Sequence, residues 1–487
     1  MVVHKSESVR RAAVVALRRL RSGAVSEFLK DESALVVAEA ARAIHDTPIP
    51  VGMKSLAAMI EKTRPKNGHA EDGNTEDENL VRRILNANYR LGTKEAAERI
   101  ASYATRVSAS SPMRIEALEM LADWSQPDPR DRVLNVYRPL EAREAKDASS
   151  ALAPHIESLM ASEDELKEKT IEVASSLGIS KIIPMLVNRI EDQELSAQLR
   201  ATSLQALSHL DHKKAVSLAR TVKMLPATEL LPTALNVLAS YDAGNSLPKF
   251  IEGTQSRNME ARQISWDILA KQNDPTALAT IVAGVESYLD GSLSGDVHLN
   301  VMEAAEGKLD ETLQKSLLEH GKALSRKDPL ANFLVATEGG DKEKGKEIFF
   351  ERTQLSCVRC HKVDRAGGEV GPNLTKIGSE KDRRYLLESI CLPDAQIAKG
   401  FETAIIVNDS GQVFTGIVKT DNDDFVELIQ NDGSQIRIPG EEIVGKKNGK
   451  SSMPNDLAKQ ITLRELRDLV AYLASLKKDS RTDDDIE

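Results

Sequence analysis

The feature of this sequence that most constrains its fold is a short amphipathic pattern that recurs along the first two thirds of the chain. From Ser8 to about Ala336, apolar residues follow one another at spacings of three and four, and short breaks containing Pro, Gly or Asp separate the segments. Small residues, mostly alanine, occupy the middle of each segment. The clearest examples are residues 35–44, 113–122, 169–178, 199–208 and 261–270. The pattern predicts a mainly α fold built from many short helices.

Small residues in the middle of a helix allow neighbouring helices to approach closely. Stacked helix pairs then bury a continuous core that no single pair can bury. In this respect the segments resemble HEAT-like repeats, and the resemblance implies an α-solenoid over residues 1–337. A closed helical bundle remains the alternative, because alanine-rich amphipathic helices also occur in bundles.

The composition excludes several classes of protein. With 487 residues the chain is too long for one compact domain. Its 75 acidic residues outnumber its 65 basic residues and give a net charge of −10, so no nucleic-acid partner is predicted. No apolar run reaches the length of about 18 residues that crosses a bilayer, so no membrane-spanning segment is predicted.

The polar, acidic stretch at residues 66–79 is predicted to be a solvated loop.

A second domain is predicted to begin after Gly339-Gly340, where the composition changes. The helical repeats stop there, and all three cysteines lie beyond this point. We assign residues 341–478 to this domain and residues 479–487 to a disordered tail. Four segments within the domain alternate apolar with polar side chains and are separated by turn residues; they are residues 402–407, 413–419, 425–429 and 435–439. These segments predict a small antiparallel β insertion at about residues 401–443.

The motif that carries chemistry is CVRCH at residues 357–361. Its C-x-x-C-H spacing is the attachment signature of c-type haem. The thiols of Cys357 and Cys360 can form thioether bonds with the two vinyl groups of one porphyrin, and the adjoining imidazole of His361 then lies under the iron as an axial ligand. The motif predicts one covalently attached haem c. Two alternatives remain open, namely a zinc site with Cys391 as a third ligand and a redox-active thiol pair.

Elimination identifies a candidate for the second axial ligand. Beyond Asp341 the chain has one histidine, His361, and one methionine, Met453. A thioether opposite an imidazole is a usual pair in electron-transfer haem proteins, and it raises the reduction potential. We therefore predict His361 and Met453 as the iron ligands; otherwise the iron is five-coordinate or bound by Lys or water. A turn at Gly371 and Pro372 is predicted to offer a backbone carbonyl to Nδ1 of His361.

Several motifs in the second domain together resemble a known family. They are similar to the c-type haem-binding domain of planctomycete and verrucomicrobial proteins, which is commonly fused to HEAT-like repeats. The motifs are GKEIF at residues 345–349, CVRCH, VGPNLT at residues 370–375, the segment 383–403 and SSMP at residues 451–454. The resemblance covers most of residues 341–478. It implies a class I cytochrome c-like domain with thioether links at Cys357 and Cys360, iron ligation by His361 and Met453, and electron transfer.

These features predict a mono-haem c-type cytochrome that transfers electrons and carries a helical-repeat scaffold for docking. Its partner is predicted to be a redox protein or a dehydrogenase module, and no catalytic residue is predicted in this chain. Many relatives carry an N-terminal β-propeller that resembles sugar dehydrogenases, and no segment of this sequence resembles that propeller. The alternative function is a non-redox, HEAT-like protein-binding scaffold with a structural zinc site.

The chemistry of haem attachment also predicts a compartment. Covalent haem is attached outside the cytoplasm, so we expect a periplasmic or otherwise exported protein. The start of the sequence contains no recognisable secretory signal, and the repeat pattern has begun by Val9. We therefore expect this chain to be the C-terminal part of a larger exported redox protein.

Overall fold

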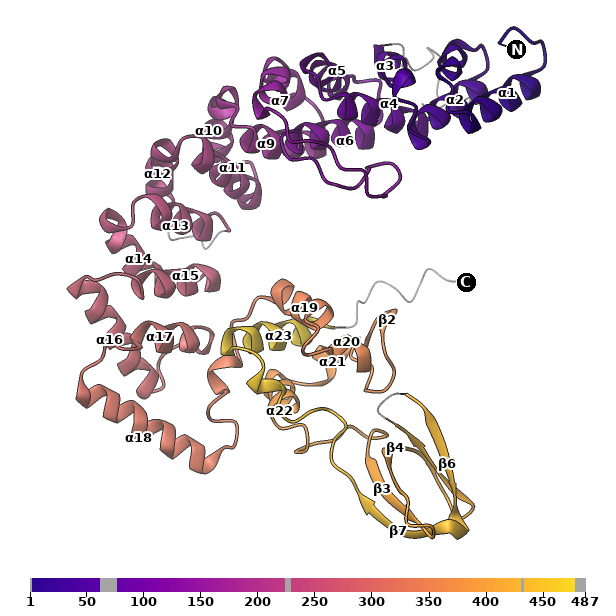
Figure 1. Cartoon of the computed structure of the whole chain (residues 1–487). Helices are drawn as coiled ribbons and strands as arrows, with labels where there is room; N and C mark the ends of the chain where they lie inside the picture. Colours follow the sequence, from indigo (N-terminus) through magenta and orange to yellow (C-terminus); the bar gives the residue numbers. More distant parts are fainter. Residues whose placement is uncertain (1, 62–76, 224–228, 431–432, 478–487) are drawn as a thin grey trace. The chain divides into compact units, whose positions relative to one another are not determined.

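The computed structural model describes residues 2–61, 77–223, 229–430 and 433–477, and it contains two compact units (Figure 1). The first unit extends to Val222 and includes Glu229–Asp242, and the second contains Lys223 and the described residues from Ala243 onward. Helices predominate in both units, and the strands lie in the C-terminal part of the second. The prediction of a mainly α fold with a small antiparallel sheet is therefore confirmed. The HEAT-like solenoid arrangement stays a prediction.

The described helices of the first unit are α1 (Glu7–Arg19), α2 (Ala34–Asp46), α3 (Pro50–Ala58), α4 (Glu78–Leu91), α5 (Lys94–Ala104), α6 (Ser111–Ala122), α7 (Ala145–Leu152), α8 (Ile156–Met160), α9 (Asp164–Ser176), α10 (Ile183–Glu191), α11 (Ala197–Leu210), α12 (His212–Thr221) and α13 (Leu230–Tyr241). Helices adjacent in sequence form pairs, such as α1 with α2, α3 with α4 and α10 with α11. The pairs stack, because α2 packs on α4, α4 on α6, α6 on α9, α9 on α11 and α11 on α13. Ala40, Ala41 and Ala117 are fully buried, as expected for small residues at close helix contacts.

All five of the clearest predicted segments form helices, which are α2, α6, α9, α11 and, in the second unit, α15 (Met259–Leu269). Residues 66–76 of the predicted acidic loop and residues 479–487 of the predicted tail lie outside the described residues. The end of the predicted loop is instead the start of α4. The side chain of Asp77 caps this helix by accepting hydrogen bonds from the backbone N–H groups of Asn79 and Leu80, at 3.0 and 3.3 Å.

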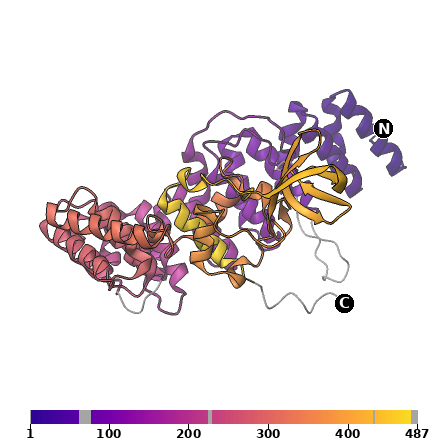
Figure 2. The same cartoon turned by 90° about the horizontal axis from the view of Figure 1, so that it is seen from below.

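The second unit contains the last helices of the repeat region and the helices that follow Gly339-Gly340. The first group comprises α14 (Leu247–Gly253), α15, α16 (Pro275–Leu289), α17 (His298–Ala305) and α18 (Glu311–Lys327). The second group comprises α19 (Lys342–Glu351), α20 (Cys357–Cys360), α21 (Ile377–Glu380), α22 (Arg383–Cys391) and α23 (Leu463–Ser475). In Figure 2 the yellow helix α23 lies between the pink helices of the first group and the orange helices that precede it.

The crossing of α19 and α23 forms the centre of the C-terminal domain. Gly345 on α19 lies so close to α23 that a Cβ atom at this position would overlap the carbonyl oxygen of Asp468. The aromatic rings of Phe349 and Tyr472 meet beside this contact, with their centroids 5.6 Å apart. A shared core surrounds the crossing, and its buried members are Leu330, Ala336, Phe349, Val363, Leu386, Leu387, Ile390, Cys391, Leu466, Leu469, Val470, Tyr472 and Leu473.

A capping box begins helix α23. The side chain of Thr462 accepts a hydrogen bond from the backbone N–H of Glu465, and the carboxylate of Glu465 accepts one from the backbone N–H of Thr462. This capping box satisfies two backbone donors that would otherwise lack partners at the helix start. The amphipathic pattern beyond it buries Leu466, Leu469 and Leu473.

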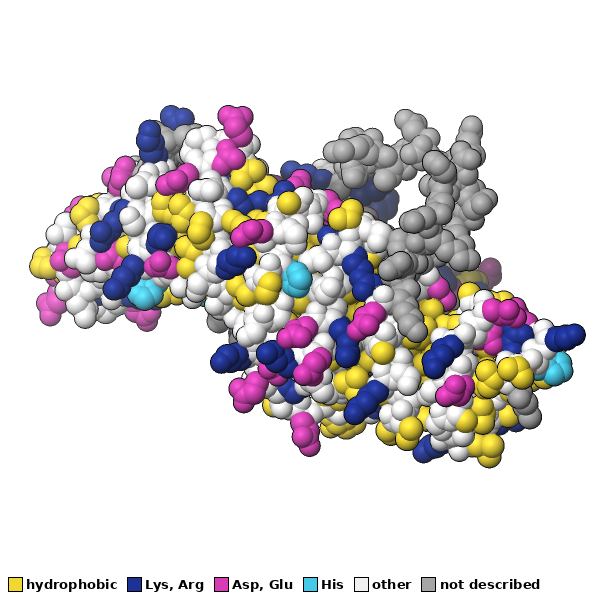
Figure 3. All heavy atoms as spheres, turned by 90° about the horizontal axis from the view of Figure 1, so that it is seen from above, with side chains coloured by type: hydrophobic (Ala, Val, Ile, Leu, Met, Phe, Trp, Pro, Cys, Tyr) yellow, Lys and Arg dark blue, Asp and Glu magenta, His cyan; other side chains and the backbone are white. Residues whose placement is uncertain are grey.

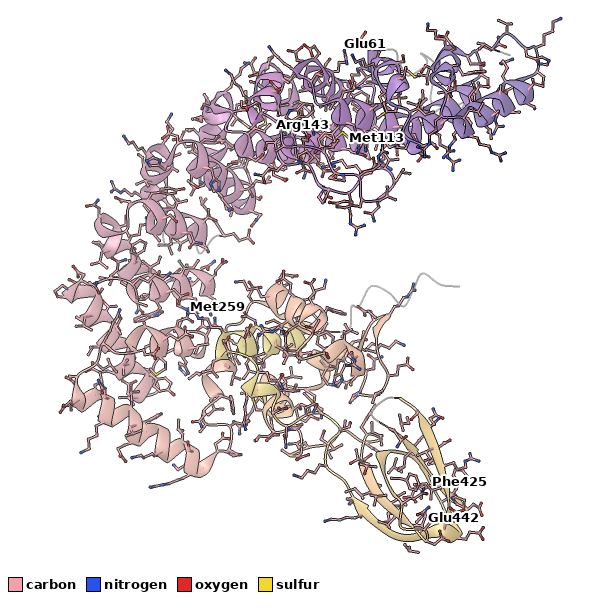
Figure 4. All side chains as sticks on the ribbon, in the orientation of Figure 1. Glu61, Met113, Arg143, Met259, Phe425 and Glu442 are labelled. Atoms are coloured by element: carbon pink, nitrogen blue, oxygen red, sulfur yellow. The ribbon has the colours of Figure 1, made fainter. Side chains whose placement is uncertain are left out.

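An antiparallel sheet of five strands lies between α22 and α23 in the sequence. Its strands are β3 (Thr403–Asn408), β4 (Val413–Asp421), β5 (Phe425–Ile429), β6 (Gln435–Pro439) and β7 (Ile443–Asn448), in the spatial order β6-β5-β4-β3-β7. One face buries a small core of its own, which includes Ile406, Leu428 and Ile438. On β5, the ring of Phe425 contacts the guanidinium of Arg437, whose Cζ is 3.8 Å from the ring centroid (Figure 4). A separate two-stranded hairpin, β1 (Lys362–Val363) and β2 (Ala366–Gly367), follows α20.

The strand β7 was not predicted, and it extends the sheet beyond residue 443 to Asn448. The reason is physical, since β7 pairs only with β3 at the edge of the sheet and has little buried surface. Lys446, Lys447 and Asn448 are all exposed, so the strand lacks the alternation of apolar and polar side chains that marks the other four.

The last repeats hold α23 through a polar network. The guanidinium of Arg464 donates two hydrogen bonds to the carboxylate of Asp267 on α15, at 2.6 and 3.0 Å, and one to Glu303 on α17, at 2.7 Å. One turn further along α23, Arg467 donates to the amide oxygen of Asn300 at 2.8 Å. Asn300 in turn donates to Asp267 at 2.8 Å, so the contacts form one connected network. These contacts fix α23 to helices α15 and α17.

The surface carries charges of both signs. On the face shown in Figure 3, Lys and Arg side chains are interspersed with Asp and Glu side chains over the described part of the chain. Among the described helices, none is both long enough and apolar enough to cross a membrane.

Substitution of Gly345 tests the importance of the helix crossing. We expect Gly345→Ala to destabilise the α19–α23 pair by about 1–3 kcal/mol, because its methyl group meets backbone that can move only if the helices separate. Hydrogen exchange of the α19 and α23 amides measures the change. Gly321→Ala on α18 is the matched control, since a Cβ there meets no atom within 4 Å. The control should be neutral or more stable by up to about 1 kcal/mol, and equal destabilisation of both variants would contradict the prediction.

Substitution of Arg464 tests the attachment of α23 to the repeats. We expect Arg464→Ala to weaken protection of the α15 and α17 amides against hydrogen exchange by about 1 kcal/mol, a value suited to a half-exposed ion-pair network. Arg326→Ala, which removes an exposed arginine from α18, provides the control. The prediction is wrong if both variants show the same protection.

Candidate functional site

The CVRCH motif occupies the short helix α20 and the residue after it. Ser356 precedes the helix in the left-handed backbone region, with φ of 51°, and so turns the chain sharply into the motif. The side chain of Cys357 is half-buried and that of Cys360 is exposed. The backbone N–H of His361 donates to the carbonyl of Cys357 at 2.9 Å, which closes the turn and brings the three side chains together.

The imidazole of His361 is held from one side. Its Nδ1 lies 3.0 Å from the carbonyl oxygen of Pro372, so Nδ1 carries the hydrogen and Nε2 keeps a free lone pair. This contact confirms the predicted carbonyl at the turn. Gly371 lies against the ring, since a Cβ there would be 2.8 Å from Cε1 and 2.9 Å from Nδ1 of His361. Its backbone N–H also donates to the carbonyl of Cys360 at 2.7 Å. A residue without a side chain is therefore needed beside the ring.

Burial favours the uncharged forms of His361 and Cys357, because it lowers the pKa of the imidazole and raises that of the thiol. Burial lowers the pKa of His361, while the hydrogen bond to Pro372 acts in the opposite direction. Burial also raises the pKa of the Cys357 thiol to about 11. A neutral imidazole is the form that binds a metal ion through its free nitrogen, so the protonation state of His361 suits axial ligation.

A cavity brings the predicted site residues together. Cys357, Cys360, His361, Pro372 and Met453 all line it, although Met453 is far from the others in sequence. Most of the remaining lining is apolar and comes from the segments 370–377, 385–401 and 451–457 and from α23. These lining residues include Leu355, Val370, Leu374, Ile377, Tyr385, Leu386, Ile390, Ile397, Phe401, Leu457 and Leu473.

Cys391, the third ligand of the zinc alternative, lies in the core. It is buried among Leu387, Ile390 and their neighbours, and burial raises the pKa of its thiol to about 12. The cavity lining includes Cys357 and Cys360 but does not include Cys391. Within residues 2–61, 77–223, 229–430 and 433–477, no group of three or more His, Cys, Asp or Glu side chains could hold a metal ion.

The residues of the cavity fit haem c. A porphyrin requires an apolar slot with a few polar groups at fixed points, and the lining has this character. Cys357 and Cys360 supply two thiols on one wall, and His361 supplies a neutral nitrogen whose ring orientation is fixed by Gly371 and Pro372. The imidazole ring occupies the space that a Cβ at position 371 would fill.

Comparison with protein families agrees with this geometry. Residues 342–431 match the family model for cytochrome c. The chain therefore contains a cytochrome c domain, which supports covalently bound haem c and electron transfer based on haem. The match includes Cys357, Cys360, His361 and Pro372 and ends within the β insertion, before Met453. A search of curated proteins returned no match.

Several cavity residues were not identified from the sequence. Tyr385, Ile390, Ile397 and Phe401 come from α22 and from the loop that follows it. Apolar residues at helical spacing on α22, such as Leu386 and Ile390, predict only a buried face, because a residue that lines a cavity and a residue that fills a core give the same pattern.

Proposed function

We propose that this protein is a mono-haem c-type cytochrome that transfers electrons. The observation that carries the proposal is that His361, fixed by the carbonyl of Pro372, and Met453 line one apolar cavity together with the paired thiols of Cys357 and Cys360. When bound, the haem supplies an iron centre that gains and loses one electron. The chain's residues bind the group, orient its ligands and exclude water from it.

Each site residue has a proposed role. Cys357 and Cys360 would hold the porphyrin through thioether bonds, so the group could not dissociate. His361 and Met453 would bind the iron, and a thioether paired with an imidazole favours a high reduction potential. Pro372 fixes the imidazole ring through its carbonyl, an outer contact of the kind that tunes a ligand's basicity. The apolar lining keeps water away, which reduces the solvent reorganisation that accompanies electron transfer.

We further propose that residues 1–337 form a HEAT-like α-solenoid that docks a partner, and that residues 341–478 form a class I cytochrome c-like domain. The stacked helix pairs of the first unit support the solenoid. The network from Arg464 and Arg467 to the last repeats supports a scaffold that holds the haem domain in one position. Residues 330–336, before this proposed boundary, contribute Leu330 and Ala336 to the core of the haem domain.

The proposed partner is a redox protein or a dehydrogenase module, and the proposed location is the periplasm or another site outside the cytoplasm. Attachment of haem to two thiols requires that both stay reduced until the bonds form, and this chemistry takes place in the exported state. The mixed charges of the surface suit a protein partner better than a polyanion.

Cysteine variants test covalent attachment. In protein matured with the haem-attachment machinery, Cys357→Ala and Cys360→Ala are each expected to leave one thioether bond, because each variant keeps only one of the two thiols. One vinyl group of the haem then stays unsaturated. The pyridine haemochrome spectrum should shift to longer wavelength, and the double variant should hold no haem that survives denaturation. Cys391→Ala is the matched control and should retain both bonds. Colourless wild-type protein that contains zinc would overturn the proposal.

A methionine variant tests the second axial ligand. Met453→Ala is expected to remove the weak charge-transfer band that ferric haem shows at the red end of the visible spectrum when a thioether sulfur is bound. It should also lower the reduction potential, since a thioether ligand favours the reduced iron. Met259→Ala, which changes a partly exposed methionine at the start of α15 (Figure 4), should leave both properties unchanged. If the band persists in Met453→Ala, another group is the ligand.

A further inference from the structure

The β insertion begins and ends beside the loop that carries Met453. Its first strand, β3, starts at Thr403, directly after the loop that contributes Phe401 to the cavity. Its last strand, β7, ends at Asn448, shortly before Met453. The two strands are paired, and Ala404 lies opposite Asn448 in the register. The pairing of β3 with β7 therefore places the end of the insertion next to its start, and both lie beside the cavity.

Thr403 binds the loop from the sheet side. Its carbonyl oxygen accepts a hydrogen bond from the backbone N–H of Gly449 at 2.8 Å. Its side-chain hydroxyl donates to the carbonyl oxygen of Lys450. The side chain is only 5% exposed, so water competes poorly for these groups. A Cβ at position 449 would overlap the Thr403 hydroxyl, so Gly449 is required for this approach.

Asp394 lies in the segment that follows α22, and it binds the same loop. Its Oδ1 accepts a hydrogen bond from the backbone N–H of Ser451 at 2.8 Å. The hydroxyl of Ser451 then accepts one from the backbone N–H of Met453 at 3.2 Å. A continuous chain of contacts thus runs from Asp394 through Ser451 to the methionine. A carboxylate acceptor makes the first of these bonds stronger than a neutral one.

We infer that Asp394 and Thr403 are positioning residues for Met453 and that the β insertion acts as a clamp on the methionine loop. This inference rests on the proposed function, in which Met453 is an axial ligand. The two residues hold residues 449–451 from two directions, so the Met453 side chain is presented to the cavity before any ligand bond forms. Such an arrangement reduces the conformational freedom that ligation must remove.

The clamp should govern how easily an external ligand replaces Met453. Imidazole binds ferric haem only in molecules where the methionine has left the iron, so its apparent affinity rises with the population of that open state. Loss of one net hydrogen bond in the clamp corresponds to about a tenfold change in that population. Loosening the loop should therefore raise the apparent affinity for imidazole without altering the covalent attachment.

The experiment is a titration of the ferric full-length holoprotein with imidazole, followed by absorption. Asp394→Ala and Thr403→Val are each expected to bind imidazole about tenfold more tightly than the wild type. Asp394→Asn and Thr403→Ser, which keep an oxygen at the same position, should restore values near the wild type. The controls Asp409→Ala and Thr415→Val change an exposed residue of the same type elsewhere in the sheet and should have no effect.

Hydrogen exchange provides a readout that does not depend on iron ligation. The amides of Gly449 and Ser451 should exchange about tenfold faster in Thr403→Val and Asp394→Ala, respectively. Asp394 lies outside the sheet, so Asp394→Ala carries the test if Thr403→Val fails to fold. Unchanged imidazole affinity and unchanged exchange in Asp394→Ala would overturn the clamp, as would an equal rise in the controls.

The same measurements separate the clamp from the proposed function. If wild-type protein holds covalent haem but binds imidazole as tightly as Met453→Ala, then Met453 is not the ligand and the inference falls with that assignment. If wild-type protein resists imidazole and all clamp variants resist it equally, the cytochrome assignment stands and only the clamp is wrong.

Discussion

The close crossing of α19 and α23 at Gly345 is the contact on which the C-terminal domain depends. Backbone meets backbone there, and a Cβ at Gly345 would overlap the carbonyl oxygen of Asp468. Because the two helices come from opposite ends of the domain in the sequence, their contact closes the domain. Leu473 lines that cavity from α23, while α19 leads directly into the segment that carries Cys357.

Helix α23 contributes to the cavity lining and also contacts helices α15 and α17. One side packs on α19 and reaches the cavity, and the other places Arg464 and Arg467 against α15 and α17. Because α23 contacts α19 on one face and α15 and α17 on the other, both sets of contacts resist movement of the helix. Helices α15 and α17 therefore contribute to the rigidity of the cytochrome c domain. Rigidity matters for electron transfer, since the surroundings of the iron then reorganise little between oxidation states.

Local features of this fold were readable from the sequence, whereas contacts between distant segments were not. The repeating helices, the capping box at Thr462 and the carbonyl of Pro372 near His361 follow from spacing and turn chemistry within a few residues. The contact of Asp394 with Ser451 joins residues 57 apart in sequence, and no local pattern marks either partner. The exposed edge strand β7 was missed for a related reason, because its position depends on pairing with β3 rather than on its own side chains. Methionine ligation was inferred by elimination, which identifies the residue but not what holds it.

The pairing of β3 with β7 also explains how a long insertion is tolerated between the two segments of the site. The entropy lost on closing a flexible loop grows only with the logarithm of its length, so each doubling of length adds about 0.6 kcal/mol. What matters more is whether the ends of the insertion are held together. Here Ala404 and Asn448 lie opposite each other in the sheet, and the bond from Gly449 to Thr403 continues the ladder toward Met453. Folding of the sheet therefore closes the insertion itself, and it does so beside the loop that carries Met453.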